Sequence, residues 1–314
     1  MRAMAVRSWL PAPPFDHLPG KLKVTIDPQK LLNFRIPAVR QTVTPRDAAF
    51  YALSIGMGRD PTDLAQLPFV DPLRGPVAMP GMALVLASPG FWLGHPDSGV
   101  DPVSVLHAGQ SMVLLGPVPA TGEVESTTRV THIVDKGAGK AALIFTETNI
   151  RDDRGTCFAC LERTIFIRGG GGFGGEGEAP RSSPVPVAEG NAALVIDLTT
   201  GPEQALIYRL NGDLNPLHSD PAIAARAGYR MPILHGLGTM GIIVHAILRG
   251  RLGYQAERLR AVQLRFAAPV FPGETIRTEI WNNGAFRASV LERDVIVADQ
   301  GFFTISPDEG DAVS

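Results

Sequence analysis

The chain is short of cysteine and of charge, and it has no long hydrophobic run. It contains two cysteines in 314 residues, and only 19% of its residues are charged, with a net charge of −2. A nearly neutral chain lacks the basic surface that nucleic acid requires, so no nucleic-acid partner is expected. No apolar run reaches the ~20 residues of a membrane helix, and the first residues lack the apolar stretch of a secretory signal. We therefore expect a cytoplasmic protein with no membrane partner.

Both cysteines lie in one stretch, TCFACLERTIFI, whose β-branched and aromatic residues are typical of a strand. Cys157 and Cys160 are three residues apart, a spacing that places side chains on opposite faces of a regular strand. A redox pair is therefore not favoured. A zinc site is not favoured either, because it would need more ligands than lie nearby.

Hydrophobic residues make up 45% of the chain, which is enough for a real core. The length fits one large domain or two of ordinary size. Long strand-like segments with short turns between them predict an antiparallel sheet in each half of the chain. The predicted strands span 103–115, 124–134, 141–150, 156–167, 260–268, 275–281, 286–293 and 295–305. The sequence Asn282-Asn283-Gly284 predicts a hairpin turn between two of them.

Few helices are predicted. Residues 1 to about 40 are proline-rich and are expected to be irregular. Thr44 is a predicted N-cap, followed by Pro45 and Asp47, for an amphipathic helix that runs to Leu53. The stretch from about 60 to 99 predicts only short helical pieces. Residues 235–252 form the longest helical candidate, with one broad apolar face.

The chain divides into an N-terminal arm (1–24), a first half (25–168), a Gly/Pro-rich linker (169–195) and a second half (196–314). The glycines at 169–175 are not followed by Gly-Lys-Ser/Thr, so a linker is favoured over a phosphate-binding loop. Short matches between the halves indicate an old internal duplication. For example, Phe50-Tyr51-Ala52-Leu53 corresponds to Ile207-Tyr208-Arg209-Leu210.

The stretch YRLNGDLNPLH (208–218) has the strongest chemical character. Gly212 and Pro216 both interrupt a helix, so Asp213 and His218 are expected on a bent loop. An acid and an imidazole held close together can share acid–base work. An isolated pair of this kind would more often be a solvated acid and a packed histidine.

The eleven-residue stretch resembles the hydratase 2 motif of the MaoC-like, R-specific enoyl-CoA hydratases. Segments 232–237 and 265–273 continue the pattern, and 105–107, 135–137 and 170–175 resemble the first half of the same enzymes. The resemblance covers nearly all of residues 25–305. It implies an α+β double hot-dog fold, with two curved antiparallel sheets and a long central helix retained mainly in the second half.

The resemblance also implies roles. Asp213 and His218 would hold a water, Asn215 would orient the pair or the water, and Gly236 would offer its N–H to the thioester oxygen. Arg265 could contact a phosphate of coenzyme A or could simply flank a strand. No metal or separate cofactor is implied, because coenzyme A is part of the acyl-CoA substrate, and a homodimer is expected.

Two positions depart from the family pattern. Asn211 stands where Ser or Thr is usual, and it can still make the local turn hydrogen bond. Gly109 stands in the segment 108–110, where many relatives carry an acid, so help from that acid is in doubt.

The expected reaction is reversible hydration of trans-2-enoyl-CoA to (R)-3-hydroxyacyl-CoA. The loss of the first-half helix favours long, branched or steroid-derived acyl chains. A hot-dog thioesterase and a non-catalytic thioester-binding module remain as alternatives, because fold alone does not settle function.

Overall fold

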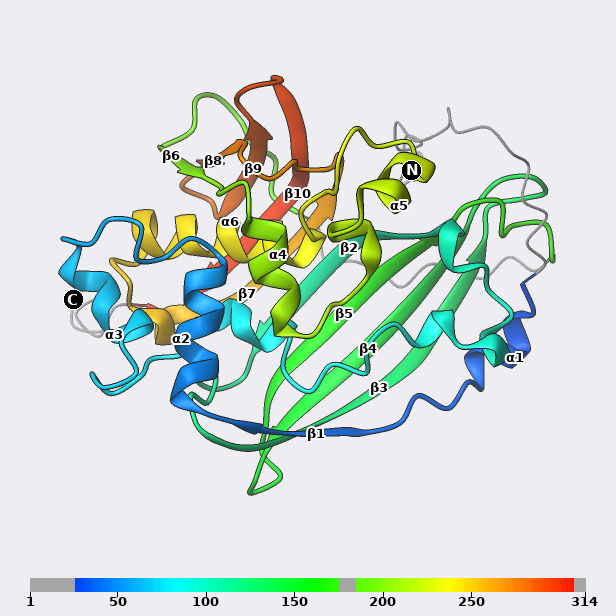
Figure 1. The fold of residues 1–314 in the computed structure, drawn as a ribbon, viewed down its shortest axis with the longest axis horizontal. Helices are drawn as coiled ribbons and strands as arrows, with labels where there is room; N and C mark the ends of the chain where they lie inside the picture. The colour runs from blue at the N-terminus through cyan, green and yellow to red at the C-terminus, as the bar shows by residue number, and fades with distance from the viewer. Residues whose placement is uncertain (1–25, 175–184, 308–314) are drawn as a thin grey trace, which may run out of the picture.

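The computed structural model describes residues 26–174 and 185–307. The predicted N-terminal arm lies outside these residues. The described chain forms one ten-stranded antiparallel sheet with helices packed mainly on one part of it (Figure 1). The strands are β1 Val39–Val43, β2 Val105–Leu114, β3 Gly122–Asp135, β4 Ala142–Asp152, β5 Cys157–Ile167, β6 Leu194–Thr199, β7 Leu259–Phe266, β8 Thr275–Ile280, β9 Ala285–Val290 and β10 Val295–Ile305. The α-helices are α1 Pro28–Leu32, α2 Pro45–Ser54, α3 Leu67–Val70, α4 Gln204–Tyr208, α5 Pro221–Arg226 and α6 Gly236–Arg251.

The strand order repeats between the two halves. The first half runs β1-β3-β4-β5-β2, and the second half, read from its outer edge, runs β6-β8-β9-β10-β7. Corresponding strands therefore occupy corresponding places, as an internal duplication would produce. The two expected sheets are joined edge to edge, because β2 pairs with β7 over Gly109 to Val113.

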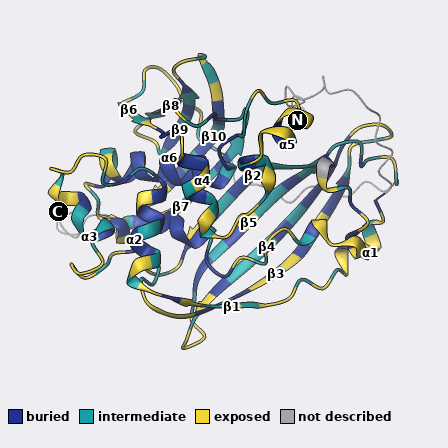
Figure 2. Ribbon diagram, viewed as in Figure 1, coloured by how far each residue is buried: buried dark blue, intermediate teal, exposed yellow. Residues whose placement is uncertain are grey.

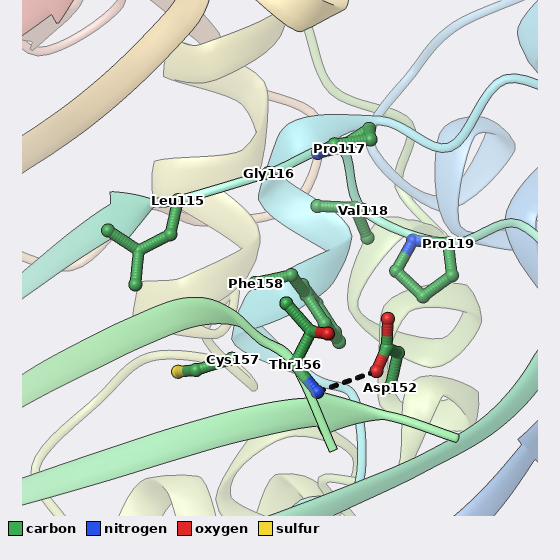
Figure 3. Close-up of a pocket in the computed structure, with 9 residues that line it drawn as sticks. All are labelled: Leu115, Gly116, Pro117, Val118, Pro119, Asp152, Thr156, Cys157 and Phe158. Atoms are coloured by element: carbon green, nitrogen blue, oxygen red, sulfur yellow. Dashed lines mark hydrogen bonds between the residues drawn. The ribbon is translucent and has the colours of Figure 1, made fainter. Parts of the chain in front are cut away.

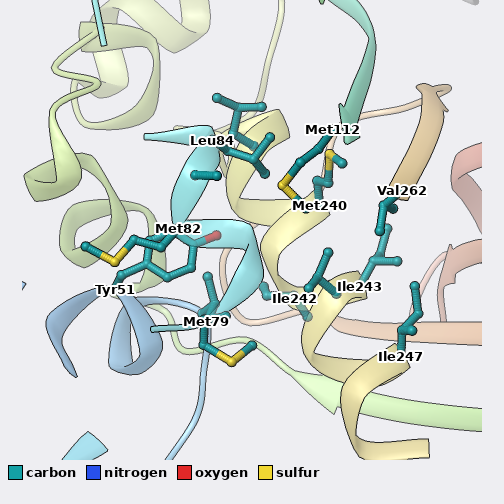
Figure 4. Packing of buried hydrophobic residues seen from close by; sticks show 14 of the residues in the cluster. Tyr51, Met79, Met82, Leu84, Met112, Met240, Ile242, Ile243, Ile247 and Val262 are labelled. Carbon is teal, nitrogen blue, oxygen red and sulfur yellow. The ribbon is translucent and has the colours of Figure 1, made fainter. Parts of the chain in front are cut away.

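Helix α6 is the centre of the second half. Every residue from Leu237 to Leu248 is buried, so the helix is covered on all sides and not only along one face. Figure 2 shows this burial, in contrast to α1, where most residues are exposed or half-buried. Met240, Ile243 and Ile247 belong to the main apolar cluster (Figure 4), which also takes in Tyr51 of α2 and Met112 of β2.

The first half has no equivalent of α6 among its described residues. The short 3-10 helix Pro80–Leu84 packs against α6, and other short turns cross the first-half sheet. The predicted absence of a long first-half helix is confirmed. Two other local predictions are also confirmed: Thr44 and Asp47 form a capping box at α2, and residues 282–284 link β8 to β9.

Some elements were not predicted. Residues 26–40 are not irregular throughout, because they include α1 and the start of β1. Strand β6 was also missed, and it begins at Leu194, inside the range predicted as linker. Strands β1 and β6 are short and lie at the two edges of the sheet, where each pairs with only one other strand.

The prediction that the two cysteines face opposite sides is wrong. Their Sγ atoms lie 3.8 Å apart, and Cys160 Sγ lies 3.0 Å from Asn149 Oδ1. The cause is a bulge in β5, where the pairing with β4 shifts between Ile150 and Arg151. The extra residue turns Cys157 to the side that Cys160 faces. Both thiols are free, and burial raises the pKa of Cys160 to about 11, so this thiol is a poor nucleophile.

The glycine-rich loop after β5 is held by an acid and not by a phosphate. The carboxylate of Asp135 accepts hydrogen bonds from the N–H groups of Gly137, Gly172 and Gly174 at 2.7–2.8 Å. Desolvation raises the pKa of Asp135, but the combined backbone hydrogen bonds outweigh it, so the net pKa is lowered. Gly171 cannot carry a side chain, because a Cβ there would lie 2.5 Å from Gly137 O. The loop is therefore a packed connection.

None of the described helices has the length and apolar character to cross a bilayer.

Candidate active site

The loop between α4 and α5 has the bent form that its sequence predicts. After α4, a 3-10 turn ends at Gly212, whose φ of 117° strongly favours glycine. A second 3-10 turn, Pro216–His218, is capped by the Asn215 side chain, which accepts from Leu217 N at 3.0 Å. Asn211 donates to Tyr208 O and to Ser54 Oγ, both at 2.9 Å, so the unusual residue still makes the turn bond and also anchors the loop to α2.

This loop brings three side chains together. One ligand-type atom from each of Asp213, His218 and His235 lies within 4.8 Å of the others. Asp213 is exposed, whereas both imidazoles are buried. The carboxylate of Asp213 accepts from Asn215 N at 3.2 Å. Asn215 thus shapes the loop around the acid, through its backbone and its side chain.

His218 has a defined tautomer. Its Nδ1 lies 2.8 Å from the carbonyl oxygen of Ile233. A carbonyl can only accept, so Nδ1 must carry the proton and Nε2 must present its lone pair. Burial is the main cause that lowers the pKa of His218, so the ring is neutral near pH 7. A neutral imidazole with an available Nε2 is equipped to take a proton from water.

His235 packs against His218 and bonds to the backbone of Asp213. It is the N-terminal flanking residue of α6, and its Nε2 donates to Asp213 O at 3.1 Å. Its ring stacks on His218 with centroids 3.7 Å apart and lies 5.1 Å from the ring of Tyr208. Burial, followed by the proximity of His218, lowers the pKa of His235 to about 3. His235 thus packs at the start of α6, and its contact with the loop that carries Asp213 and His218 was not predicted.

The same three side chains form the only group among the described residues that could be considered as a metal site. The histidine geometry does not favour that use. One nitrogen of each ring is taken by a carbonyl oxygen. The two rings are stacked 3.7 Å apart at an interplanar angle of 26°, which is the arrangement of packed aromatic side chains.

Gly236 begins α6 beside the two histidines. The first N–H groups of a helix have no intrahelical acceptor, and they attract negative charge. A Cβ at this position would lie 3.3 Å from the ring of Phe266, so the close approach of this ring favours glycine. Phe266 in turn contacts His107 of the first half, with ring centroids 4.9 Å apart.

Arg265 does not lie beside the pair. Its neighbours Leu264 and Phe266 face the core and the site, so Arg265 is on the opposite face of β7. There its guanidinium forms a two-pronged ion pair with Asp299. Of the two interpretations left open by the sequence, this position favours the strand-flanking one.

Two hollows lie elsewhere on the surface. One of about 290 Å³ opens beyond the ends of β2 and β5, lined by residues such as Leu115, Pro117 and Phe158 (Figure 3). The other, of about 260 Å³, is lined by residues that follow α2, such as Arg59 and Asp63, and by residues of α6 and β6. Neither includes Asp213 or His218, so the site is identified by its chemistry and not by cavity size.

Sequence comparisons agree with this geometry. Residues 42–169 match the MFE-2 hydratase 2 N-terminal domain, and residues 180–300 match the MaoC like domain. The enoyl-CoA hydratase ChsH3 of Mycobacterium tuberculosis is 37% identical over 265 residues, which cover 82% of this chain and 90% of that protein. The chain belongs to the MaoC-like hydratase 2 family.

Further relatives of this family support the assignment. The peroxisomal enoyl-CoA hydratase 2 of Arabidopsis thaliana is 35% identical over 85% of this chain and 92% of its own length. A MaoC-like dehydratase from Phytophthora capsici superposes with a TM-score of 0.77 at 33% identity, covering 89% of this chain and 99% of that one. A Mycobacterium tuberculosis protein described as having a double hotdog fold superposes with a TM-score of 0.53 at 16% identity, covering 93% and 97% of the two chains. The predicted α+β double hot-dog fold is confirmed.

Proposed function

We propose that this hydratase 2 family member catalyses the reversible hydration of trans-2-enoyl-CoA to (R)-3-hydroxyacyl-CoA. The observation that carries the proposal is the pair formed by Asp213 and His218, in which the imidazole is neutral and its Nε2 is available. The relatives named as enoyl-CoA hydratases cover most of this chain, which supports the same reaction here.

In this mechanism a water molecule lies between Asp213 and His218. Nε2 of His218 takes a proton from the water as its oxygen forms a bond to C3 of the enoyl group. The electrons of the C2–C3 double bond move toward the thioester, and the pair then returns a proton to C2. One water is consumed, and no electrons are gained or lost. General acid–base catalysis of this type contributes typically about 10²–10⁴-fold in rate.

The negative charge that develops on the thioester oxygen needs a donor. The backbone N–H of Gly236, at the start of a 16-residue helix, is suited to this role. Asn215 orients the carboxylate of Asp213 through its own backbone N–H. The reaction requires no metal or separate cofactor, because coenzyme A is part of the substrate.

The acyl chain extends over the first half of the molecule. This half lacks a long helix among its described residues, which supports acceptance of a bulky acyl chain, branched or steroid-derived chains included. A graded panel of enoyl-CoAs tests this point, and a strict preference for the four-carbon substrate would refute it.

We also propose that the protein acts in the cytoplasm as a homodimer. Four leucines on or near the catalytic loop, Leu53, Leu206, Leu210 and Leu214, are 47–65% exposed and could be covered by a second copy. Analytical ultracentrifugation tests the dimer, and a monomer at micromolar concentration would contradict it.

A thioesterase is the principal alternative, since hot-dog proteins host both chemistries. Two readings on the same sample separate them: loss of the enoyl-thioester absorbance reports hydration, and appearance of a free thiol reports hydrolysis. We expect the first without the second, with the R alcohol as the product on chiral analysis. Thiol release that keeps pace with the loss of substrate would favour the thioesterase, and the absence of both signals would favour a binding module.

A further inference from the structure

One row of polar side chains interrupts the apolar inner face of the first-half sheet. Arg163 on β5 pairs across the sheet with Thr146 of β4 and with Gln110 of β2. Along β5 its neighbours on the same face are Leu161 and Ile165, both buried. These two residues belong to two separate hydrophobic clusters, so the polar row lies between the clusters.

Arg163 has no anionic partner among the described residues. Its Nε donates to Gln110 Oε1 at 3.4 Å, which is at the outer limit of a hydrogen bond. Other arginines have a carboxylate partner: Arg287 of β9 donates twice to Glu279, and Arg293, in the turn after β9, donates twice to Glu274. Burial is the main cause that lowers the pKa of Arg163, whereas Asp213 raises it. Moving an unpaired guanidinium from water to a place among apolar residues costs free energy. The presence of Arg163 in this row therefore needs an explanation.

The position of Arg163 relates it to the reaction. Its charge acts on Asp213 and Tyr208 in the second half and on His107 in the first. Its partner Gln110 on β2 pairs in turn with Leu264 of β7, so the row also reaches the junction of the two halves through strand pairing. An acyl chain that extends from the catalytic pair over the first-half sheet would meet this row.

We propose that Arg163, assisted by Gln110, binds a carboxylate carried on the acyl chain of the substrate. The proposal rests on the hydratase function and names a substrate class for it: enoyl-CoA thioesters of dicarboxylic acids. A guanidinium matches the two oxygens of a carboxylate, and the amide of Gln110 can donate a further hydrogen bond. An unsubstituted acyl chain of the same length would cover the guanidinium of Arg163 without forming an ion pair with it. The enzyme should therefore prefer the acyl chain that carries a carboxylate.

The test compares two thioesters of equal length, trans-2-hexenoyl-CoA and the trans-2-enoyl-CoA of the six-carbon dicarboxylic acid. Eight- and ten-carbon pairs extend the series. We expect wild-type protein to show a kcat/KM about 10- to 100-fold higher for the carboxylate at one of these lengths, the range that a charge-assisted hydrogen bond supplies. Arg163→Met should lower this selectivity ratio by a similar factor, mainly through KM.

The matched control is Arg129→Met, at an exposed arginine of β3 that pairs with Glu147. It should leave the ratio unchanged. A wild-type preference for the unsubstituted chain at every length would overturn the proposal, as would an Arg163→Met variant that loses activity equally on both members of each pair. If Arg163→Met does not fold, the test is the wild-type ratio of kcat/KM for the two members of each pair. A wild-type protein inactive on all enoyl-CoAs would instead refute the hydratase function itself.

Discussion

At the residue scale, the site depends on how the tautomers of two histidines are fixed. Ile233 O fixes the proton of His218 on Nδ1, and Asp213 O fixes the proton of His235 on Nε2. The backbone between α5 and α6 thus determines which nitrogen of His218 is left with a free lone pair. A base positioned in this way needs no change of ring orientation before it acts.

The lowered pKa of His218 leads to a prediction about pH. Because burial favours the neutral ring, the base stays competent down to pH values below 6.5 and is lost only when the ring is protonated. The acid limb of kcat/KM should therefore lie below pH 6.5. Rates measured across the pH range at limiting substrate give the acid limb of kcat/KM, and rates at saturating substrate give that of kcat. An acid limb of kcat/KM centred above pH 6.5 would contradict a His218 base with a lowered pKa.

Sequence alone identified the main residues of the candidate site, but it did not single out Arg163, for a physical reason. The helix-breaking Gly212 and Pro216 made the loop predictable around Asp213 and His218. Arg163 was not predicted, because the face that a strand residue occupies depends on bulges that its sequence does not reveal. The same bulge in β5 misled the interpretation of Cys157 and Cys160.

At the scale of elements, strong turn and cap signals were read correctly, and short edge strands were not. The long antiparallel strands and α6 carry hydrophobic patterns over many residues, so their existence was predictable. Strands β1 and β6 have five and six residues, and only their pairing with β3 and β8 defines them. A local sequence pattern does not reveal which strand, distant in the sequence, a segment will pair with.

The glycine-rich loop offers a test at this scale. Gly171→Ala should destabilise the protein by about 1–3 kcal/mol, because a Cβ would overlap two carbonyl oxygens and the carboxylate of Asp135. Gly116→Ala is a suitable control, since its Cβ would meet only Phe158 Cβ at 3.8 Å. Urea unfolding of both variants measures the difference. Equal stability of the two would show that the loop is not packed as described.

At the scale of the whole molecule, the two halves of the sheet differ although their strand orders correspond. The second half contains α6 and the loop with Asp213 and His218, and the first half has no long helix among its described residues. Contacts such as Asn211 with Ser54 and Phe266 with His107 connect the halves at the site. The catalytic loop is therefore positioned by both halves, although its proposed catalytic groups come from one.

Buried histidines also make the stability of the whole protein depend on pH. The pKa of His235 is lowered to about 3 and that of His245 to about 4, in both cases mainly by burial. Unfolded histidines bind protons near pH 6.5, so the unfolded state gains protons first as pH falls. Stability should be full above pH 6.5 and decline progressively from there toward pH 4.

Urea unfolding midpoints at pH 7.5, 6 and 5 measure this decline. His245→Leu should flatten it, whereas His132→Gln, at an exposed position on β3, should leave it unchanged. A midpoint that is constant between pH 7.5 and 5 would contradict the buried, neutral state of these rings.

The most direct measurement of the central claim is the hydration rate of Asp213→Asn, with Asp294→Asn as the matched control. Asp294 is an exposed acid in the turn between β9 and β10. The account predicts that Asp213→Asn lowers kcat by about 10²–10⁴-fold without loss of folding, and that the control retains the wild-type rate and the R product. Full activity of Asp213→Asn would contradict the account.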